Sequence, residues 1–173
     1  MQSWTIGGYH LLETGDYQHG FNVTAMLAER SDAINPALGN TTRSLTIGLN
    51  EQFPTPLYAN VQVNLLDVEG ETLTQNLATL SGKVGYRFAA QGLNVALAAQ
   101  NTNASFKAFT AGVTTPAFEQ DSDRFTLTLN GGWQFRPDMD LEIRVGYNRY
   151  QEEQNPDNQY TERFLILRHR YVF

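Results

Sequence analysis

Apolar and polar residues alternate through most of this chain, and this alternation constrains its fold more than any other feature. In the segment 57–65 the apolar positions are Leu57, Ala59, Val61, Val63 and Leu65, and polar or small residues separate them. Successive side chains of a β-strand point to opposite faces, so such a segment predicts a strand with one apolar and one polar face. No stretch shows the period of about 3.6 residues that an amphipathic helix requires. The sequence therefore predicts an all-β protein.

Nine segments carry this pattern, and polar connections separate them. We expect strands at 4–12, 21–28, 45–50, 57–65, 78–88, 93–99, 124–135, 141–148 and 160–173. The faces of the first segment are ambiguous, because Tyr9 to Leu12 are consecutive bulky residues. Short turns are expected near 15–16, 54–56, 89–92 and 136–140, and longer loops at 30–41, 67–75, 102–123 and 151–159. This asymmetry predicts one domain over 1–173, an antiparallel up-and-down transmembrane β-barrel of about eight or nine strands or a segment of a larger barrel.

An alternating strand has two interpretations. In a soluble barrel the apolar face points inward, whereas in a membrane barrel it meets lipid and the lumen is polar. Charged residues make up 17% of the chain, below the roughly 25% of soluble domains. That shortage fits a large apolar exterior, but it also fits a soluble all-β protein rich in Ser, Thr and Asn. Composition alone leaves both interpretations open.

The placement of aromatic residues favours the membrane interpretation. Eight of them lie beside the short turns or at the C-terminus: Phe21, Phe53, Tyr86, Phe88, Trp133, Phe135, Tyr171 and Phe173. They predict one interfacial belt, because amphipathic rings are favoured where membrane meets water. Tyr147, Tyr150 and Tyr160, near the loop at 151–159, predict part of an opposite belt. The alternative is that these rings are core aromatics at the strand ends of a soluble sheet.

The charged residues of the polar face also favour the membrane interpretation. Six are basic and two are acidic: Lys83, Arg87, Arg124, Arg144, Arg168 and Arg170, with Glu142 and Glu162. Burying them in a soluble core would cost several kcal/mol for each unpaired ion, and a wet lumen removes that cost. The excess of bases predicts a lumen-lining basic wall, and such side chains favour anions in pores. The alternative is that the charges pair across neighbouring strands and plug a narrow barrel.

The last segment carries the most specific motif. Leu165, Leu167, His169, Tyr171 and Phe173 fall on one face, and the chain ends on the phenylalanine. This resembles the last-strand signal of bacterial outer-membrane β-barrel proteins, although His169 departs from the apolar residue usual there. The resemblance implies a porin-like protein in the outer membrane of a Gram-negative cell envelope. It also implies that the barrel-assembly machinery reads Leu165, Leu167, Tyr171 and Phe173 as an assembly signal, and it identifies a superfamily rather than a member.

Strand parity adds a constraint to this resemblance. The C-terminus lies on the short-turn side, which in the resembled superfamily is the periplasm, so the segment 4–12 would begin on the extracellular side. Single-chain bacterial barrels have an even number of strands. Either 4–12 is not a strand and the barrel is a complete eight-stranded one, or strands precede Trp4, or the barrel is shared between chains.

Motifs for catalysis or cofactor binding are missing from the sequence. It contains no nucleophile elbow, phosphate loop or zinc-protease motif, and no cysteine, so we expect no enzyme, cofactor or metal site. A barrel enzyme would gather its site at the loop end, where Asp121, Asp123, Glu152 and Glu153 lie, but solvated loop acids explain these residues.

The expected function is therefore a pore, transport or structural barrel with a polar lumen and acidic extracellular loops. Adhesive barrels without a pore and soluble lipocalin-like ligand-binding barrels remain as alternatives. Expected partners are outer-membrane lipid, lipopolysaccharide and the assembly machinery, with other envelope proteins or further strands of the same barrel. No basic stripe indicates binding of nucleic acid.

Overall fold

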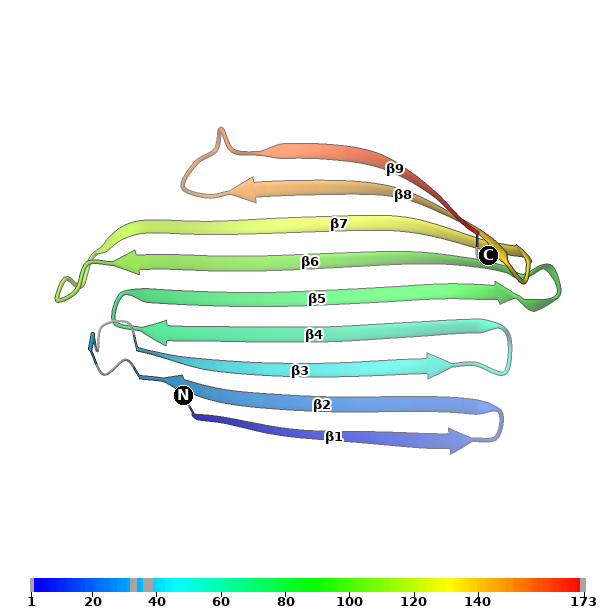
Figure 1. The fold of residues 1–173 in the computed structure, drawn as a ribbon, viewed down its shortest axis with the longest axis horizontal. Helices are drawn as coiled ribbons and strands as arrows, with labels where there is room; N and C mark the ends of the chain where they lie inside the picture. The colour runs from blue at the N-terminus through cyan, green and yellow to red at the C-terminus, as the bar shows by residue number, and fades with distance from the viewer. Residues whose placement is uncertain (1, 32–33, 36–38, 172–173) are drawn as a thin grey trace.

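A single antiparallel sheet makes up the computed structural model, which describes residues 2–31, 34–35 and 39–171. The elements are β1 (Gln2–Thr14), β2 (Tyr17–Arg30), β3 (Asn40–Gln52), β4 (Leu57–Gly70), β5 (Leu73–Phe88), the 3-10 turn η2 (Ala89–Gln91), β6 (Leu93–Phe109), β7 (Pro116–Arg136), β8 (Met139–Glu152) and β9 (Tyr160–Tyr171). Each strand pairs with its neighbours in the chain, in the order β1 to β9 (Figure 1). The described residues contain no helix long and apolar enough to cross a membrane.

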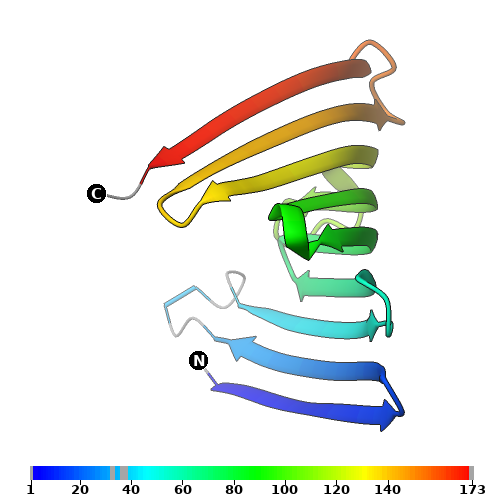
Figure 2. The same cartoon turned by 90° about the vertical axis from the view of Figure 1, so that its right-hand side faces the viewer.

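The sheet confirms the all-β antiparallel up-and-down arrangement, but it is not closed. Within the described residues β1 pairs with β2 alone and β9 with β8 alone. Figure 2 shows the sheet curved into an arc, with β1 and β9 at its two ends. The alternative in which the segment 4–12 is not a strand is wrong, because β1 pairs along its whole length with β2.

Strand register gives the sheet two chemically distinct faces. On the apolar face, Leu129 of β7 stands opposite Leu97 of β6 and Val145 of β8. On the polar face, the adjacent Thr128 stands opposite Ala98 and Gly146. Pairing also resolves the ambiguous faces of β1, since Trp4, Ile6 and Leu12 stand opposite Leu27, Ala25 and His19 on the apolar face. Tyr9 and Leu11 therefore belong to the polar face.

Among the residues that the structure describes, no apolar core lies on either side of the sheet. Ala28 and Ala96 are the only buried hydrophobic residues among those described, whereas Leu129 is 49% exposed and Leu165 is 69% exposed. All the buried residues stand on the polar face: Gly20, Ala28, Gly48, Gly85, Ala96, Gly146, Asn148 and Glu152. Side chains crowd together on the inside of a curved sheet, so we place the polar face on the concave side of the arc and the apolar face on the convex side.

Strands at the loop end are longer than predicted. The expected loop 67–75 is a turn at 71–72, and the expected loop 102–123 contracts to 110–115. Polar side chains pair across these extensions: Arg43 donates to Asp67 over 3.0 Å and to Glu69 over 3.2 Å, and Lys107 forms an ion pair with Glu119. Beyond the apolar stretch both faces carry a mixture of polar and apolar side chains: Leu66 stands opposite Leu77 on the polar face, whereas Arg43 pairs with Asp67 on the apolar face. Alternation therefore no longer marks a strand there. Figure 1 shows these loops at the left and the shorter turns at the right.

Aromatic rings gather on the apolar face near the short turns. The ring centroids of Tyr86 and Phe88 are 4.6 Å apart, and those of Trp133 and Phe135 are 5.2 Å apart. Phe173 lies outside the described residues.

The predicted opposite belt is wrong for two of its three members. Tyr150 and Tyr160 stand opposite each other on the polar face, with ring centroids 5.3 Å apart, and only Tyr147 lies on the apolar face. The reason is parity, because Tyr147 and Tyr150 are an odd number of residues apart and a regular strand points them to opposite sides.

Candidate functional site on the polar face

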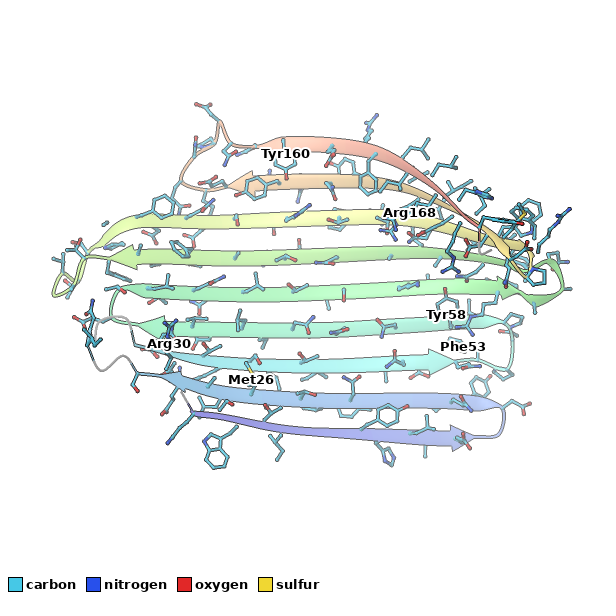
Figure 3. All side chains as sticks on the ribbon, viewed as in Figure 1. Met26, Arg30, Phe53, Tyr58, Tyr160 and Arg168 are labelled. Carbon is cyan, nitrogen blue, oxygen red and sulfur yellow. The ribbon has the colours of Figure 1, made fainter. Side chains whose placement is uncertain are left out.

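The predicted charged residues come from four strands and share the polar face of the sheet. Lys83 and Arg87 lie on β5, Arg124 on β7, Glu142 and Arg144 on β8, and Glu162, Arg168 and Arg170 on β9. They do not form one continuous wall. Two separate groups lie toward the short-turn end, where Figure 3 labels Tyr58 and Arg168. Arg124 and Glu162 lie in the loop-side halves of β7 and β9.

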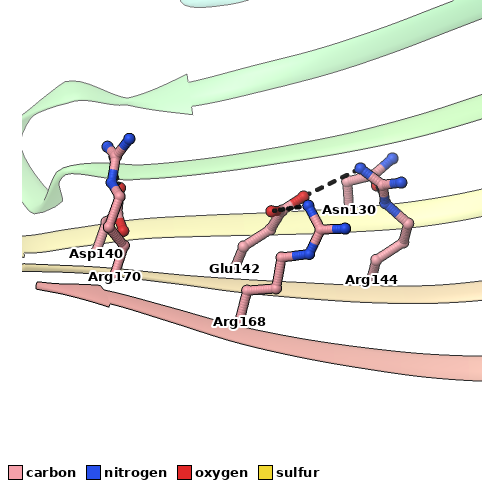
Figure 4. Close-up of polar contacts among 6 residues, drawn as sticks. All are labelled: Asn130, Asp140, Glu142, Arg144, Arg168 and Arg170. Atoms are coloured by element: carbon pink, nitrogen blue, oxygen red, sulfur yellow. Dashed lines mark hydrogen bonds and ion pairs between the residues drawn. The ribbon is translucent and has the colours of Figure 1, made fainter.

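The first group, which we call the arginine group, consists of Asp140, Glu142, Arg144, Arg168 and Arg170. Glu142 lies between two guanidinium groups: its carboxylate is 3.1 Å from Nη2 of Arg144 and 3.8 Å from Nη1 of Arg168 (Figure 4). Arg170 forms a separate pair with Asp140 at 2.6 Å. These arginines therefore have carboxylate partners on neighbouring positions of β8, and most of their charge is locally compensated.

Asp140 is a partner that the sequence did not reveal. The sequence places it in a turn at 136–140, whereas β8 begins at Met139 and pairs Asp140 with Arg170. Asn130 is a second missed partner, because its Oδ1 accepts a hydrogen bond of 2.8 Å from Nε of Arg144. For Asp140, the only signal in the sequence is that it lies beside a turn. The ends of elements next to turns are the hardest to predict.

The second group, which we call the Tyr58 group, consists of Tyr58, Lys83 and Arg87. Nζ of Lys83 lies 5.5 Å from the centroid of the Tyr58 ring, and Cζ of Arg87 lies 4.8 Å from it. Neither cation forms an ion pair with a carboxylate among the described residues. Both cations contact the face of an aromatic ring, which is a favourable position for a positive charge.

The remaining charged residues of the polar face are partnered differently from the prediction. Glu162 accepts a hydrogen bond of 3.1 Å from Nδ2 of Asn148, rather than pairing with an arginine. Glu152 is buried and accepts hydrogen bonds from Asn158 and Tyr150. Arg124 stands opposite Thr102 and Tyr150. The polar face also carries the acids Glu13, Asp140 and Glu152 and the base Arg30, so bases dominate this face less than the sequence suggests.

Neutral polar side chains cover much of the polar face, from its middle to the Tyr58 group. Thr46 donates to Asn64 over 3.0 Å, and Asn60 donates to Asn50 over 2.6 Å. The hydroxyl groups of Thr79 and Thr102 are 3.2 Å apart. Amides and hydroxyls in such rows bind one another and water, so this face is suited to line an aqueous space rather than a dry core.

Three of the four acidic candidates for a catalytic site border one hollow, and the fourth, Glu152, lies on the other face of the sheet. Asp121 and Asp123 lie on the apolar-face side of β7, Glu152 lies on the polar face, and Glu153 follows β8. A hollow of about 830 Å³ borders Asp121, Asp123 and Glu153, but Asp121 is hydrogen-bonded to Gln154. Across the described ranges, no group of three or more His, Asp or Glu side chains could hold a metal ion.

The residues of the predicted assembly signal lie on an edge strand. Leu165, Leu167 and Tyr171 are exposed on the apolar face of β9, and Phe173 is outside the described residues. That an assembly machinery recognises these residues stays a prediction.

No protein-family model matches this chain, and no curated protein matches it either.

Proposed function

We propose that this chain forms membrane-spanning strands of a bacterial outer-membrane β-barrel and acts as a pore, transport or structural component. The observation that carries the proposal is an exposed apolar face that crosses all nine strands of a sheet without an apolar core. Burying one large apolar side chain is worth about 1.5–3 kcal/mol, so leaving a whole face in water would forgo most of the energy that holds a domain together. Lipid covers such a face without a second layer of protein.

The height of the apolar band supports this assignment. On β7 the band runs from Phe125 to Phe135, a rise of about 33 Å at roughly 3.3 Å per residue. Strands of outer-membrane barrels tilt by about 35–45°, which reduces this rise to a height of about 25 Å. That is about the height of the lipid-facing band of such barrels, and Trp133 and Phe135 stand at one of its borders, where rings favour the interface.

The free edges of β1 and β9 support a proposed barrel that includes further strands. Unpaired backbone groups in hydrocarbon cost several kcal/mol each, so open sheet edges do not occur in lipid. Because nine strands alternate in direction, β1 and β9 run in the same direction. A barrel in which every neighbouring pair is antiparallel therefore requires an odd number of additional strands between β9 and β1. In this proposal the partners are those strands, outer-membrane lipid and lipopolysaccharide, together with the assembly machinery during biogenesis.

A second candidate is an adhesive or partner-binding outer-membrane barrel without a pore. The position of Glu142 between Arg144 and Arg168 favours it, because paired charges can fill a narrow lumen. Current through a planar bilayer separates the two candidates: a pore conducts, and a plugged barrel does not.

The test of the membrane assignment uses the two tryptophans, Trp4 and Trp133, which both stand on the apolar face. The chain is refolded into vesicles of phosphatidylcholine with brominated acyl chains, which quench tryptophan only from within the membrane. We expect strong quenching in the native chain, and also in a Trp4→Phe variant that reports Trp133 alone. A monodisperse monomer without detergent, or fluorescence that brominated lipid leaves unchanged, would contradict the proposal.

A further inference from the structure

We propose that Lys83 and Arg87, held over the ring of Tyr58, form a binding site for a phosphate group on the concave face of the sheet. The binding itself does not depend on the membrane assignment. A role for the site in attracting phosphate-bearing solutes into a pore does rest on the proposed function.

Tyr58 is fixed in place by its neighbours on two strands. Its ring lies over Gly85 on β5, where an added Cβ would come within 2.4 Å of ring carbon Cζ. Its hydroxyl donates a hydrogen bond of 3.0 Å to Oδ1 of Asn94 on β6. The ring therefore lies flat across the polar face, and residue 85 has to be glycine for it to do so.

This flat ring brings two positive charges together. Lys83 and Arg87 flank Gly85 on the same strand and the same face, and both cations lie within 5.5 Å of the ring centroid. Both cations border the same hollow, so one ligand bound there can contact both. An ammonium and a guanidinium provide two charges and several donors, which match a phosphate dianion better than a singly charged carboxylate.

The contrast with the arginine group makes this site specific. Arg144, Arg168 and Arg170 are already bound to Glu142 or Asp140. Lys83 and Arg87 have no carboxylate partner within the part of the chain that the structure describes, and a neutral ring leaves their charge uncompensated. An anion arriving at the polar face therefore meets uncompensated positive charge at the Tyr58 group, and positive charge that carboxylates largely compensate at the arginine group.

Space for a ligand lies beside the two cations. A hollow of about 470 Å³ is bordered by Tyr9, Gln18, Asn50, Asn60, Lys83 and Arg87. The amides can supply further donors to phosphate oxygens. Glu51 also borders the hollow, but its side chain belongs to the apolar face, where it pairs with His19.

The test is a titration of the refolded full chain with inorganic phosphate in a neutral sugar detergent, followed by phosphorus NMR or calorimetry. We expect Lys83→Gln/Arg87→Gln to weaken binding by about tenfold or more, because two charge-assisted contacts are lost. The matched control, Arg144→Gln/Arg168→Gln, removes the same charge and should change affinity by less than about twofold if binding requires a free cation pair. Equal weakening in both variants would mean that net charge alone attracts the anion, and would overturn the site.

Two further variants separate the site from misfolding and from lipid binding. Lys83→Arg/Arg87→Lys keeps both charges and should keep binding, and Tyr58→Leu should weaken it because the platform is lost. A soluble short-chain phosphatidic acid replaces inorganic phosphate in a parallel titration. Binding of that lipid without binding of inorganic phosphate would contradict a site for the phosphate group itself. Because no bilayer is used, failure here leaves the membrane proposal standing, and failure of the quenching test leaves this one standing.

Discussion

Replacement of Leu129 by arginine tests whether lipid or water covers the apolar face. Leu129 is half exposed between Leu97 and Val145, and it stands four residues from both Phe125 and Trp133, about 13 Å along the strand in each direction. It is therefore near the middle of the apolar band. If lipid covers this face, the substitution should lower the free energy of unfolding by about 2–4 kcal/mol, as arginine does near the bilayer midplane. If water covers it, the cost should stay within about 0.5 kcal/mol, as for most surface substitutions.

Thr128→Arg is the matched control, because Thr128 is adjacent in sequence and lies on the polar face. It stands opposite Ala98 and Gly146, and its hydroxyl accepts a hydrogen bond of 3.3 Å from Asn130. An arginine there can reach water, so its cost should stay below about 1 kcal/mol. The assay is reversible unfolding by denaturant from lipid vesicles, with both variants measured against the native chain. Equal costs at the two positions would show that the faces are not lipid and water, and would refute the reasoning.

Three further predictions test other parts of the molecule. Gly146→Ala should destabilise the sheet by about 1–3 kcal/mol, because the new Cβ would lie 2.1 Å from Cζ of Phe164; in the same unfolding assay the penalty should largely disappear when Phe164 is also replaced by alanine. Arg144→Glu combined with Arg168→Glu should reduce the anion preference of the pore in a planar bilayer under a salt gradient, and a cation-selective native chain would contradict this. Phe173→Ala should lower the amount of protein in the outer membrane of cells more than it lowers refolding in vitro, and unchanged outer-membrane levels would reject its role in assembly.

The centres of the strands could be predicted from the sequence, because one face is apolar over the whole width of the band. In 124–135 the alternation is regular, and β7 contains that segment. Strand ends could not be predicted in this way. Beyond the band each face mixes polar and apolar side chains, and pairs such as Arg43 with Asp67 extend the strands without leaving a period in the sequence.

The charged residues of the candidate site were also only partly predictable. Parity along a strand is enough to assign Lys83 or Arg168 to the polar face. It does not identify partners, because these depend on the register between strands and on neighbours two strands away. To predict the contact of Arg170 with Asp140, one must know where β8 begins. To predict that Lys83 and Arg87 lie over the ring of Tyr58, one must know the register of β4 against β5. Nothing in the sequence indicates that some basic residues have carboxylate partners, as in the arginine group, while others have none, as in the Tyr58 group.

Pairing of each strand only with its neighbours in the chain has a consequence for how such a sheet assembles and changes in evolution. Every ladder joins residues of one hairpin, so each can form without waiting for distant parts of the chain. Removal of the hairpin β5–β6 would bring together β4 and β7, which run in opposite directions and can pair with their apolar faces still aligned. Gain or loss of whole hairpins therefore changes the circumference in steps of two strands, and leaves the direction of both edge strands, and the side on which the loops lie, as they were.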